Sequence, residues 1–401
     1  MHVEIAKNQA VPLFWSNKTA PSKDSINIGL MVPFTSERLK AMELVAAAEF
    51  AASEINQAGG INGRPLAIVV ADDDFILENQ QQKLNELIND YEIIALVGPL
   101  ASWSVIDLAK SIAVKKLLPL FPPAANANAI SSLEDNDLVF RLAATNEQIS
   151  SKIIKFIEEN HIVKVASFYQ QNIFGIEIHD ALKRRLPEIN AQITRSYAIK
   201  LPVNYKTYSL KDEIRSIQES GSQAVFLSLP NEQLKHIIEQ FSQFWEGELP
   251  VFILPEHADW TKDKIGIDKS LCLTAVIPQI QTNTNNLLQG IKELLSISHS
   301  TYTSLFIYDS VYLIAATHKH QKKYSTTFSQ AVRAITQISK PIVTNDFNLI
   351  KKSIEQHSLL SFHGQSGKVF FDKFGNNEKV SLTVREFSHL FDKDCKKPLL
   401  Y

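Results

Sequence analysis

Short apolar runs alternate with amphipathic stretches along most of this chain. Apolar runs of strand length occupy residues 26–32, 66–71 and 93–99, while residues 39–55 and 80–91 carry apolar side chains at helical spacing. Strands that are apolar throughout are typical of a sheet buried on both faces. The order of strands and helices therefore predicts an α/β fold with a parallel sheet covered by helices on both sides.

The same alternation starts again after residue 145. Apolar runs at 164–169, 224–229 and 251–254 are separated by stretches with helical periodicity. Two successive series of this kind predict two α/β lobes, because a single hydrophobic core stops growing at about the size of one domain.

The two ends of the chain have a different pattern. Residues 1–25 show little periodicity and are predicted to form a tail. Near the other end, residues 368–372 and 379–387 lie on either side of a polar turn and read as strands. This arrangement is typical of two antiparallel strands and predicts a hairpin.

The composition limits the classes of partner that we expect for this chain. Its 401 residues are 45% hydrophobic and 21% charged, with a formal net charge of -2, and that length suffices for two domain-sized cores. Basic residues form only short, scattered groups, so no nucleic-acid partner is predicted. No apolar run reaches the length of about 18 residues that a membrane helix requires, so membrane insertion of this chain is not expected.

The N-terminal sequence MHVEIA has neither the basic nor the apolar segment with which a secretory leader begins. Two interpretations stay open: a cytoplasmic protein, or a mature or truncated chain with an added start methionine. The two cysteines, Cys272 and Cys395, lie far apart in the sequence, and this spacing is compatible with a disulfide or with two free thiols.

The segment at 54–66, with the sequence EINQAGGINGRPL, links a predicted helix to a predicted strand. Glycine often ends a helix because it accepts a left-handed backbone, and an Asn-Gly step turns the chain sharply. As a pattern, this segment resembles the helix–turn–strand signature of the branched-chain amino acid binding proteins. These are type I periplasmic ligand-binding proteins that serve ABC transporters.

Four further segments resemble motifs of that family and follow in the same order. They are VGPLAS at 97–102, PPAAN at 122–126, YDSV at 308–311 and GQSGKVFFDKFGN at 364–376. The resemblance implies two doubly wound α/β lobes, joined by three hinge crossings, with a ligand cleft between them. The implied division of the chain is a tail at 1–25, lobe 1 at 26–145 and 278–345, lobe 2 at 146–277 and 346–391, and a tail at 392–401.

The resemblance also implies binding-site residues. In the family, a serine at the position of Ser102 and a threonine in a following loop hold the carboxylate of the ligand; here Ser102 is kept, but the loop has Ala124 and Ala125. A tyrosine that contacts the ligand corresponds to Phe174, and a glutamate that receives the ammonium corresponds to Glu256. Two hydroxyl anchors are thus missing, which favours a ligand larger or less zwitterionic than leucine, such as an aromatic or amide-bearing molecule.

Two further positions are candidates for ligand contact. An aromatic residue in the family's first strand-to-helix loop aligns near Lys40, which would bring a cation into the site. Trp103 lies beside Ser102 at the end of a predicted strand, where ligands of open α/β sheets bind. The Trp103 ring is suited either to stack on a ligand or to pack against the protein.

The candidates also have structural interpretations. Ser102 is equally suited to cap a helix, and Glu256 to be a solvated loop carboxylate. Three consecutive carboxylates at 72–74 invite a metal site, but neighbouring positions do not easily face one ion, so capping or solvation is favoured. The sequence contains no zinc-binding histidine motif, no glycine-rich nucleotide loop, no nucleophile elbow and no Cys-x-x-Cys. We therefore predict no metal, no cofactor and no enzymatic activity.

The favoured hypothesis is a non-enzymatic solute-binding protein, periplasmic or otherwise extracytoplasmic. It would close on a small polar molecule, such as an amino acid, an amide or a related carboxylate, and deliver it to the membrane permease of an ABC transporter. Two alternatives stay open: the ligand-sensing domain of a receptor or regulator, and an interaction protein that kept the fold but lost the ligand. A cytoplasmic location also stays open.

Overall fold

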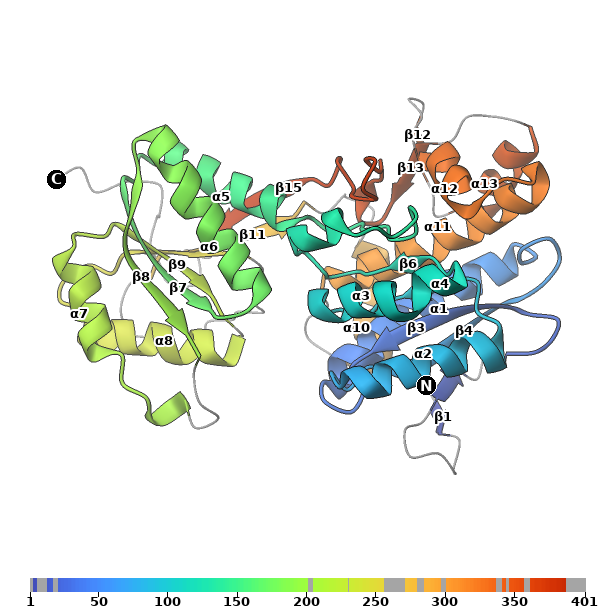
Figure 1. The fold of residues 1–401 in the computed structure, drawn as a ribbon, viewed down its shortest axis with the longest axis horizontal. Coiled ribbons are helices and arrows are strands. Elements are labelled where there is room, and N and C mark those ends of the chain that lie inside the picture. Colours follow the sequence, from blue (N-terminus) through green and yellow to red (C-terminus); the bar gives the residue numbers. More distant parts are fainter. Residues whose placement is uncertain are drawn as a thin grey trace. The chain divides into compact units, whose positions relative to one another are not determined.

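Two α/β units make up the computed structural model of this chain (Figure 1). Unit 1 comprises Met1–Ala144 and Gln279–Ser381, and unit 2 comprises Thr145–Pro278 and Leu382–Tyr401, so the chain passes between them three times. The predicted fold class, two α/β lobes with parallel sheets, is confirmed. The structure describes residues 3–5, 13–16, 21–200, 205–229, 231–255, 271–279, 285–296, 301–336, 341–343, 346–356 and 361–386.

Unit 1 is built on a six-stranded sheet in the order β1-β2-β4-β3-β5-β6. Four adjacent strands, β4, β3, β5 and β6, run parallel, while β2 and β1 extend the sheet antiparallel beside β4. Every residue of β3 and β4 is buried, which explains why both strands are apolar almost throughout. The strands are β1 (Val3–Ile5), β2 (Leu13–Ser16), β3 (Ile26–Val32), β4 (Leu66–Asp72), β5 (Leu96–Val97) and β6 (Leu120–Phe121).

Helices cover both faces of this sheet and form a core on each face. Side chains that alternate along a strand belong to opposite cores. Ile28 and Leu30 belong to one core together with residues of α1 and α11, while Met31 and Val69 belong to the other with residues of α2 and α3. The helical elements of unit 1 are α1 (Arg38–Gln57), α2 (Leu77–Tyr91), α3 (Ser102–Leu108), η1 (Ala109–Ala113), α4 (Val114–Lys116), η2 (Asn128–Ser132), α10 (Asn285–Leu295), α11 (Thr303–Tyr324), α12 (Phe328–Thr336) and α13 (Phe347–Glu355).

The first strand of the parallel set, β3, lies in the middle of the sheet. The next strand, β4, is added on one side of it and β5 on the other. Consequently α1, which follows β3, and α3, which follows β5, contribute to the cores on opposite faces. Strand order therefore reverses between β3 and β5, and this is where open α/β sheets have their ligand crevice.

The third crossing between the units differs from the expected one. We expected residues 346–391 to belong to lobe 2, whereas the chain stays in unit 1 as far as Ser381. A small sheet explains this difference: β13 (Ser361–Gly364) pairs in parallel with β12 (Pro341–Val343) and antiparallel with β14 (Gly367–Lys368). Phe362, Val369 and Phe371 are buried in the core of unit 1.

The predicted C-terminal hairpin is wrong as well. Its first half contributes the short strand β14, which pairs with β13, and its second half forms β15 (Leu382–Glu386), which pairs with β11 (Leu273–Pro278) in unit 2. The alternating pattern located the second strand, whereas the first predicted strand, 368–372, shares only Lys368 with β14, and strand pairing depends on contacts distant in sequence. The N-terminal stretch predicted to be a tail likewise contains two strands, β1 and β2, at the edge of the unit 1 sheet.

Unit 2 has a six-stranded sheet in the order β15-β11-β10-β9-β7-β8, parallel except for β15. Its core is rich in aromatic residues: the ring of Phe241 meets those of Phe168 and Phe252 edge-on, with centroids 5.8 and 5.2 Å apart. The remaining elements are α5 (Asn146–Glu159), β7 (Lys164–Gln170), α6 (Ile173–Arg185), η3 (Leu186–Ile189), β8 (Gln192–Ile199), η4 (Tyr205–Thr207), α7 (Lys211–Glu219), β9 (Ala224–Ser228), α8 (Asn231–Phe244) and β10 (Val251–Leu254).

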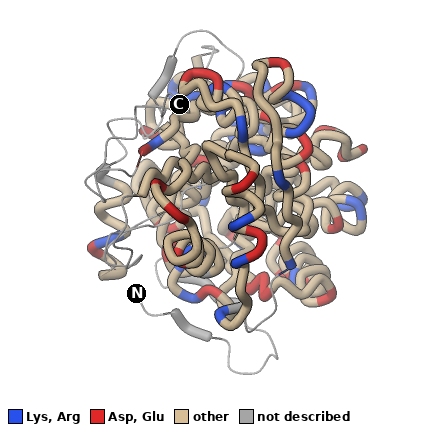
Figure 2. The backbone as a smooth tube through the Cα atoms, turned by 90° about the vertical axis from the view of Figure 1, so that its left-hand side faces the viewer, with Lys and Arg blue, Asp and Glu red and all other residues tan. Residues whose placement is uncertain are grey.

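No helix in the part of the chain that the structure describes is long and apolar enough to cross a bilayer. Figure 2 shows Lys and Arg interspersed with Asp and Glu along the backbone on the face in view. This mixture agrees with the formal net charge of -2.

Candidate functional site

The loops that follow β3, β4, β5 and β6 lie side by side, because these four strands are neighbours and run parallel. The loops occupy residues 33–37, 73–76, 98–101 and 122–127. They stand at the carboxyl edge of the unit 1 sheet, on both sides of the point where strand order reverses. Five of the predicted site residues lie in these loops or in the first turns of the helices that follow them.

The first loop is held by a carboxylate from the neighbouring strand. Asp72, the last residue of β4, accepts hydrogen bonds from the amides of Phe34 at 2.8 Å and Thr35 at 3.0 Å, and from the Thr35 hydroxyl. Asp72 is buried, and these donors compensate for the loss of its hydration. The backbone at the end of β3 is therefore fixed from β4.

Lys40 does not lie in this loop. It belongs to the first turn of α1, where its ammonium pairs with Glu37 at 3.0 Å. The aromatic residue of the loop is Phe34, which is half-buried, and the Arg38 guanidinium carbon lies 5.3 Å from the centre of its ring. The aromatic residue of this loop therefore lies six residues before Lys40, and a ligand contact by Lys40 stays a prediction.

A buried chain of side chains joins the second loop to α3, the helix that follows the third loop. Asp73 is fully buried, and its Oδ1 accepts hydrogen bonds from the Phe75 amide at 3.0 Å and the Gln80 side-chain amide at 2.7 Å. Gln80 in turn accepts a hydrogen bond from the Ser104 hydroxyl in α3. Burial raises the pKa of Asp73, and the donors from Phe75 and Gln80 offset only part of that effect.

The carboxylates at 72–74 therefore hold the first two loops in place by accepting hydrogen bonds from backbone amides. Asp74 follows the same pattern, since its Oδ1 accepts a hydrogen bond from the Ile76 amide at 3.1 Å. Among the residues that the structure describes, no group of three or more histidine, cysteine, aspartate or glutamate side chains is placed to hold a metal ion.

The third loop approaches β3 very closely. Gly98 has a φ of 103°, and a Cβ at this position would lie 2.4 Å from the Met31 carbonyl oxygen, so only glycine fits. Ala101 is the N-cap residue of α3 and Ser102 is its first helical residue, so Ser102 is not the cap. The Ser102 hydroxyl oxygen instead accepts a hydrogen bond from the Ala127 amide at 3.2 Å and so connects the third loop to the fourth.

Trp103 follows Ser102 in α3 and is 43% exposed. Trp103 is not among the residues that form the two cores of unit 1 or pack against them. The interpretation of Trp103 as a packing residue is therefore disfavoured, and its use toward a ligand stays a prediction.

The fourth loop rests on a buried arginine. The Arg141 guanidinium donates hydrogen bonds to the carbonyl oxygens of Ala125 at 3.3 Å and Ala127 at 2.7 Å, and to the side-chain oxygen of Asn376. Ala125 is buried, while Ala124 is partly exposed. The loop backbone is thus rigidly placed, although neither alanine side chain offers a hydrogen bond.

Unit 2 contributes Phe174 and Glu256 to the predicted site. Phe174 is half-buried and lies in the first turn of α6, whose N-cap Asn172 accepts a hydrogen bond from the Gly175 amide at 2.9 Å. Glu256 lies outside the described residues, just beyond the end of β10.

The sequence did not reveal several residues that lie in the four loops or hold them in place. Phe34 could have been found as the aromatic residue directly after the first buried strand. Asp72 and Asp73 were recognised only as a metal or capping candidate, and Arg141 carries no local signal at all. Its role depends on a loop 16 residues earlier and on Asn376, far along the chain.

Comparison with known proteins identifies the class of this fold. A family model described as "Periplasmic binding protein" matches residues 25–354, which is most of the chain. The chain therefore belongs to the periplasmic binding protein family, as the sequence motifs indicated. The comparison with curated proteins found no match.

Solved structures with the same fold support this identification. An ABC transporter substrate-binding protein from Desulfitobacterium hafniense in complex with Leu is similar with a TM-score of 0.68 and 17% identity, over 90% of this chain and 97% of that chain. LivJ from Streptococcus pneumoniae in complex with isoleucine is similar with a TM-score of 0.69 and 15% identity, over 90% and 99%. A solute binding protein from R. palustris in complex with benzoate is similar with a TM-score of 0.70 and 15% identity, over 90% of this chain and 93% of that chain. At these identities the similarity concerns the fold.

Proposed function

We propose that this chain is a non-enzymatic solute-binding protein that captures a small polar molecule and presents it to an ABC-transporter permease. Membership of the periplasmic binding protein family supports this function. The carrying observation is the set of four braced loops at the carboxyl edge of the unit 1 sheet, around the reversal of strand order. An edge held by buried carboxylates and a buried arginine is preorganised, which reduces the free energy lost on binding.

The donor in this site is the Ser102 hydroxyl. Its oxygen already accepts a hydrogen bond from the Ala127 amide, which leaves its hydrogen to donate to a ligand oxygen. A carboxylate or carbonyl group on the ligand is the partner that suits this donor.

The remaining surfaces favour a ligand with an apolar or aromatic part. Ala124, Ala125 and Phe174 supply no hydroxyl group, Phe34 is half-buried and Trp103 is exposed. Proteins of the same fold are described in complex with Leu, isoleucine and benzoate, so the fold accommodates small carboxylates of different shape. We propose an aromatic or amide-bearing carboxylate, with Glu256 and Lys40 as further contacts.

The test is a thermal-shift screen with amino acids, amides, small carboxylates and aromatic acids, followed by calorimetry. A ligand at a hundredfold excess over its dissociation constant should stabilise the protein by about 2.7 kcal/mol. For the ligand found, Ser102→Ala should weaken binding by about 1–2 kcal/mol, roughly tenfold, because a buried ligand oxygen would lose its donor.

The matched control is Ser111→Ala. Ser111 lies further along the same helical segment, and its hydroxyl donates to Asp107 at 3.3 Å, away from the four loops. The control should bind the ligand as tightly as the parent protein. If Ser102→Ala also binds as tightly, the site lies elsewhere. A folded protein that binds nothing in the screen would favour the alternative of an interaction protein, to which the missing hydroxyls at Ala125 and Phe174 also point.

We propose an extracytoplasmic location for this protein. The family supports it, and so does Cys272, which is disulfide-bonded in the structure. Disulfides persist mainly in oxidising compartments. The sequence has two cysteines, so Cys395, which lies outside the described residues, is the proposed partner. Mass spectrometry of a non-reduced digest should find the peptides of Cys272 and Cys395 joined, and free thiols on both would contradict the pairing.

A further inference from the structure

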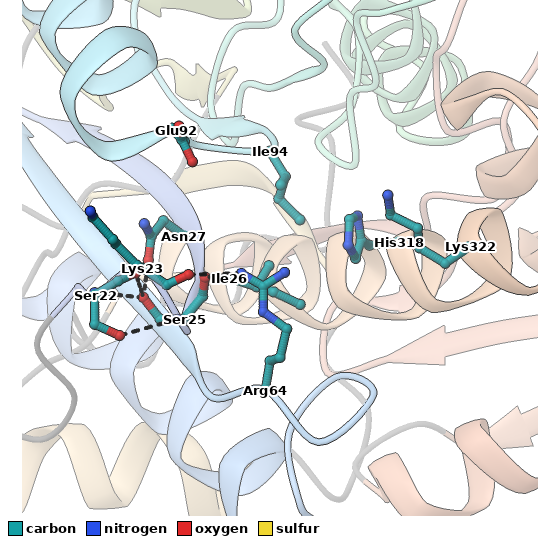
Figure 3. Close-up of a pocket in the computed structure, with 10 residues that line it drawn as sticks. All are labelled: Ser22, Lys23, Ser25, Ile26, Asn27, Arg64, Glu92, Ile94, His318 and Lys322. Carbon is teal, nitrogen blue, oxygen red and sulfur yellow. Dashed lines mark hydrogen bonds between the residues drawn. The ribbon is translucent and has the colours of Figure 1, made fainter.

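A polar pocket lies in unit 1 at the opposite edge of the sheet from the four loops. It has a volume of about 220 Å³ and is lined by residues at the amino ends of the strands and by the second half of α11 (Figure 3). Lys23, Asn27 and Ile94 line it at the beginning of β3 and before β5, Arg64 lies before β4, and His318 belongs to α11. The proposed solute site does not use any of these residues.

The glycine-rich turn at 59–64 positions Arg64. The Ile61 amide donates a hydrogen bond to the Arg64 carbonyl oxygen at 2.9 Å, and a Cβ on Gly60 would lie 2.1 Å from that oxygen, so the turn requires glycine there. The Arg64 side chain donates to the carbonyl oxygens of Asp24 at 3.0 Å and Ser25 at 2.7 Å. Figure 3 shows this guanidinium between the segment at 22–27 and α11.

The guanidinium retains donors for a ligand. Its hydrogen bonds are made by Nε and Nη2, and Nη1 donates to no atom of the described residues. Ser25 and Asn27 form a fixed polar wall beside it, since the Ser25 hydroxyl donates to the Asn27 side-chain oxygen at 2.6 Å and the Asn27 amide donates to the Tyr91 carbonyl oxygen at 2.6 Å.

The charges that line this pocket are mainly positive. Lys23, Arg64 and Lys322 are exposed and form no ion pair with any residue in the described ranges, and Glu92 is the single carboxylate among the lining residues. His318 is half-buried, and burial together with the nearby Lys322 and Arg64 lowers its pKa to about 4, so its ring is neutral at pH 7. Three of the lining residues thus carry a positive charge and one carries a negative charge.

We propose that this pocket is a binding site for a small oxyanion with two or more negative charges, such as phosphate, sulfate or a short dicarboxylate. The Arg64 guanidinium and the Lys322 ammonium of α11 offer charge-assisted donors to such an anion, and a multivalent anion gains more from them than chloride does. The neutral His318 ring can add one further hydrogen bond. Because the pocket and the four loops lie at opposite edges of the sheet, the anion would bind independently of the transported solute.

The test uses the full chain, with phosphate, sulfate and malonate as probes and chloride at equal ionic strength as the reference. Calorimetry and melting temperature should report saturable binding of at least one of the three probes. Lys322→Gln should weaken that binding about tenfold, since one charge-assisted contact is lost. The His318 ring signals in an NMR titration should move with the probe and stay in place with chloride.

Lys323→Gln is the matched control. Lys323 is the next residue of α11, but its ammonium lies 3.3 Å from the Glu355 carbonyl oxygen and does not line the pocket. This variant and Ser102→Ala should bind the probe as tightly as the parent protein. The proposal is wrong if none of the three probes binds saturably, if Lys322→Gln binds as the parent does, or if Ser102→Ala abolishes binding, because the anion would then occupy the solute site.

Discussion

Asp309 is a fully buried carboxylate in α11 that holds the turn between β13 and β14. It accepts hydrogen bonds from the amides of Gln365 and Ser366, both at 2.7 Å, and from the Ser366 hydroxyl. These donors replace the water that the carboxylate loses. Burial nevertheless outweighs them and raises the pKa of Asp309 from 3.8 to about 6.

The raised pKa predicts the direction of a pH effect on stability. Between about pH 4 and pH 6 the folded protein binds a proton at Asp309 that the unfolded chain releases, so this group's contribution to the free energy of unfolding falls as the pH rises. A pKa difference of this size corresponds to roughly 3 kcal/mol, lost by pH 7.

Asp309→Asn removes this titration. The variant should be less stable than the parent at pH 4.5, because its amide group opposes an N–H donor of the turn, and the deficit should shrink by about 2 kcal/mol at pH 7. Urea unfolding of both proteins at the two pH values measures the change. An equal deficit at both would show that Asp309 does not titrate in this range.

The pair of helices α1 and α11 is stabilised by small side chains and one shared acceptor. Alanines dominate the buried face of α1, among them Ala47, Ala48 and Ala51, and this allows α11 to approach closely. In α11, the hydroxyls of Tyr308 and Tyr312 both donate to the Glu54 carboxylate. Burial raises the pKa of both tyrosines, so both remain protonated donors.

Replacing Glu54 separates the role of the acceptor from that of packing. Glu54→Leu removes the carboxylate to which both tyrosine hydroxyls donate and should reduce the free energy of unfolding by about 2–4 kcal/mol, whereas Glu54→Gln keeps one oxygen acceptor and should lose about half as much. Urea unfolding at pH 7 compares the two variants with the parent protein. Equal losses would mean that the hydrogen bonds to Glu54 do not stabilise the helix pair.

At the scale of the whole molecule, two units with separate cores are connected by three crossings, at residues 144–145, 278–279 and 381–382. Units connected in this way can rotate about their crossings when a ligand engages both. We expect the radius of gyration to fall when the solute identified by the screen saturates the protein. Small-angle scattering with and without that solute measures the change. The control is the Ser102→Ala variant at a solute concentration that saturates the parent protein but not the variant. An unchanged radius with the solute bound would refute hinge closure.

The sequence alone determined the local elements and the class of the fold. The apolar run at 26–32 is β3 to the residue, and the predicted helix at 39–55 is α1 with one or two residues added at each end. Both depend on periodicity, which any buried strand or amphipathic helix must show. The turn at 54–66 and four ordered motifs identified the family, because glycines that permit close backbone approach leave a signal in the sequence. Ser102 and Trp103 could be placed at the sheet edge because the end of a strand is visible in the local sequence pattern.

Only the tertiary structure decided where the third crossing falls and what braces the site. Residues 361–371 have the pattern of strands in either lobe, and their place in unit 1 depends on pairing with β12 and on Asp309. Arg141 supports the loop of Ala125 together with Asn376, and Asp72 fixes the loop of Phe34 from a neighbouring strand. Such contacts join residues up to 235 positions apart. Periodicity carries no information about them, because hydrogen bonds between distant segments form only when the packed sheet brings those segments together.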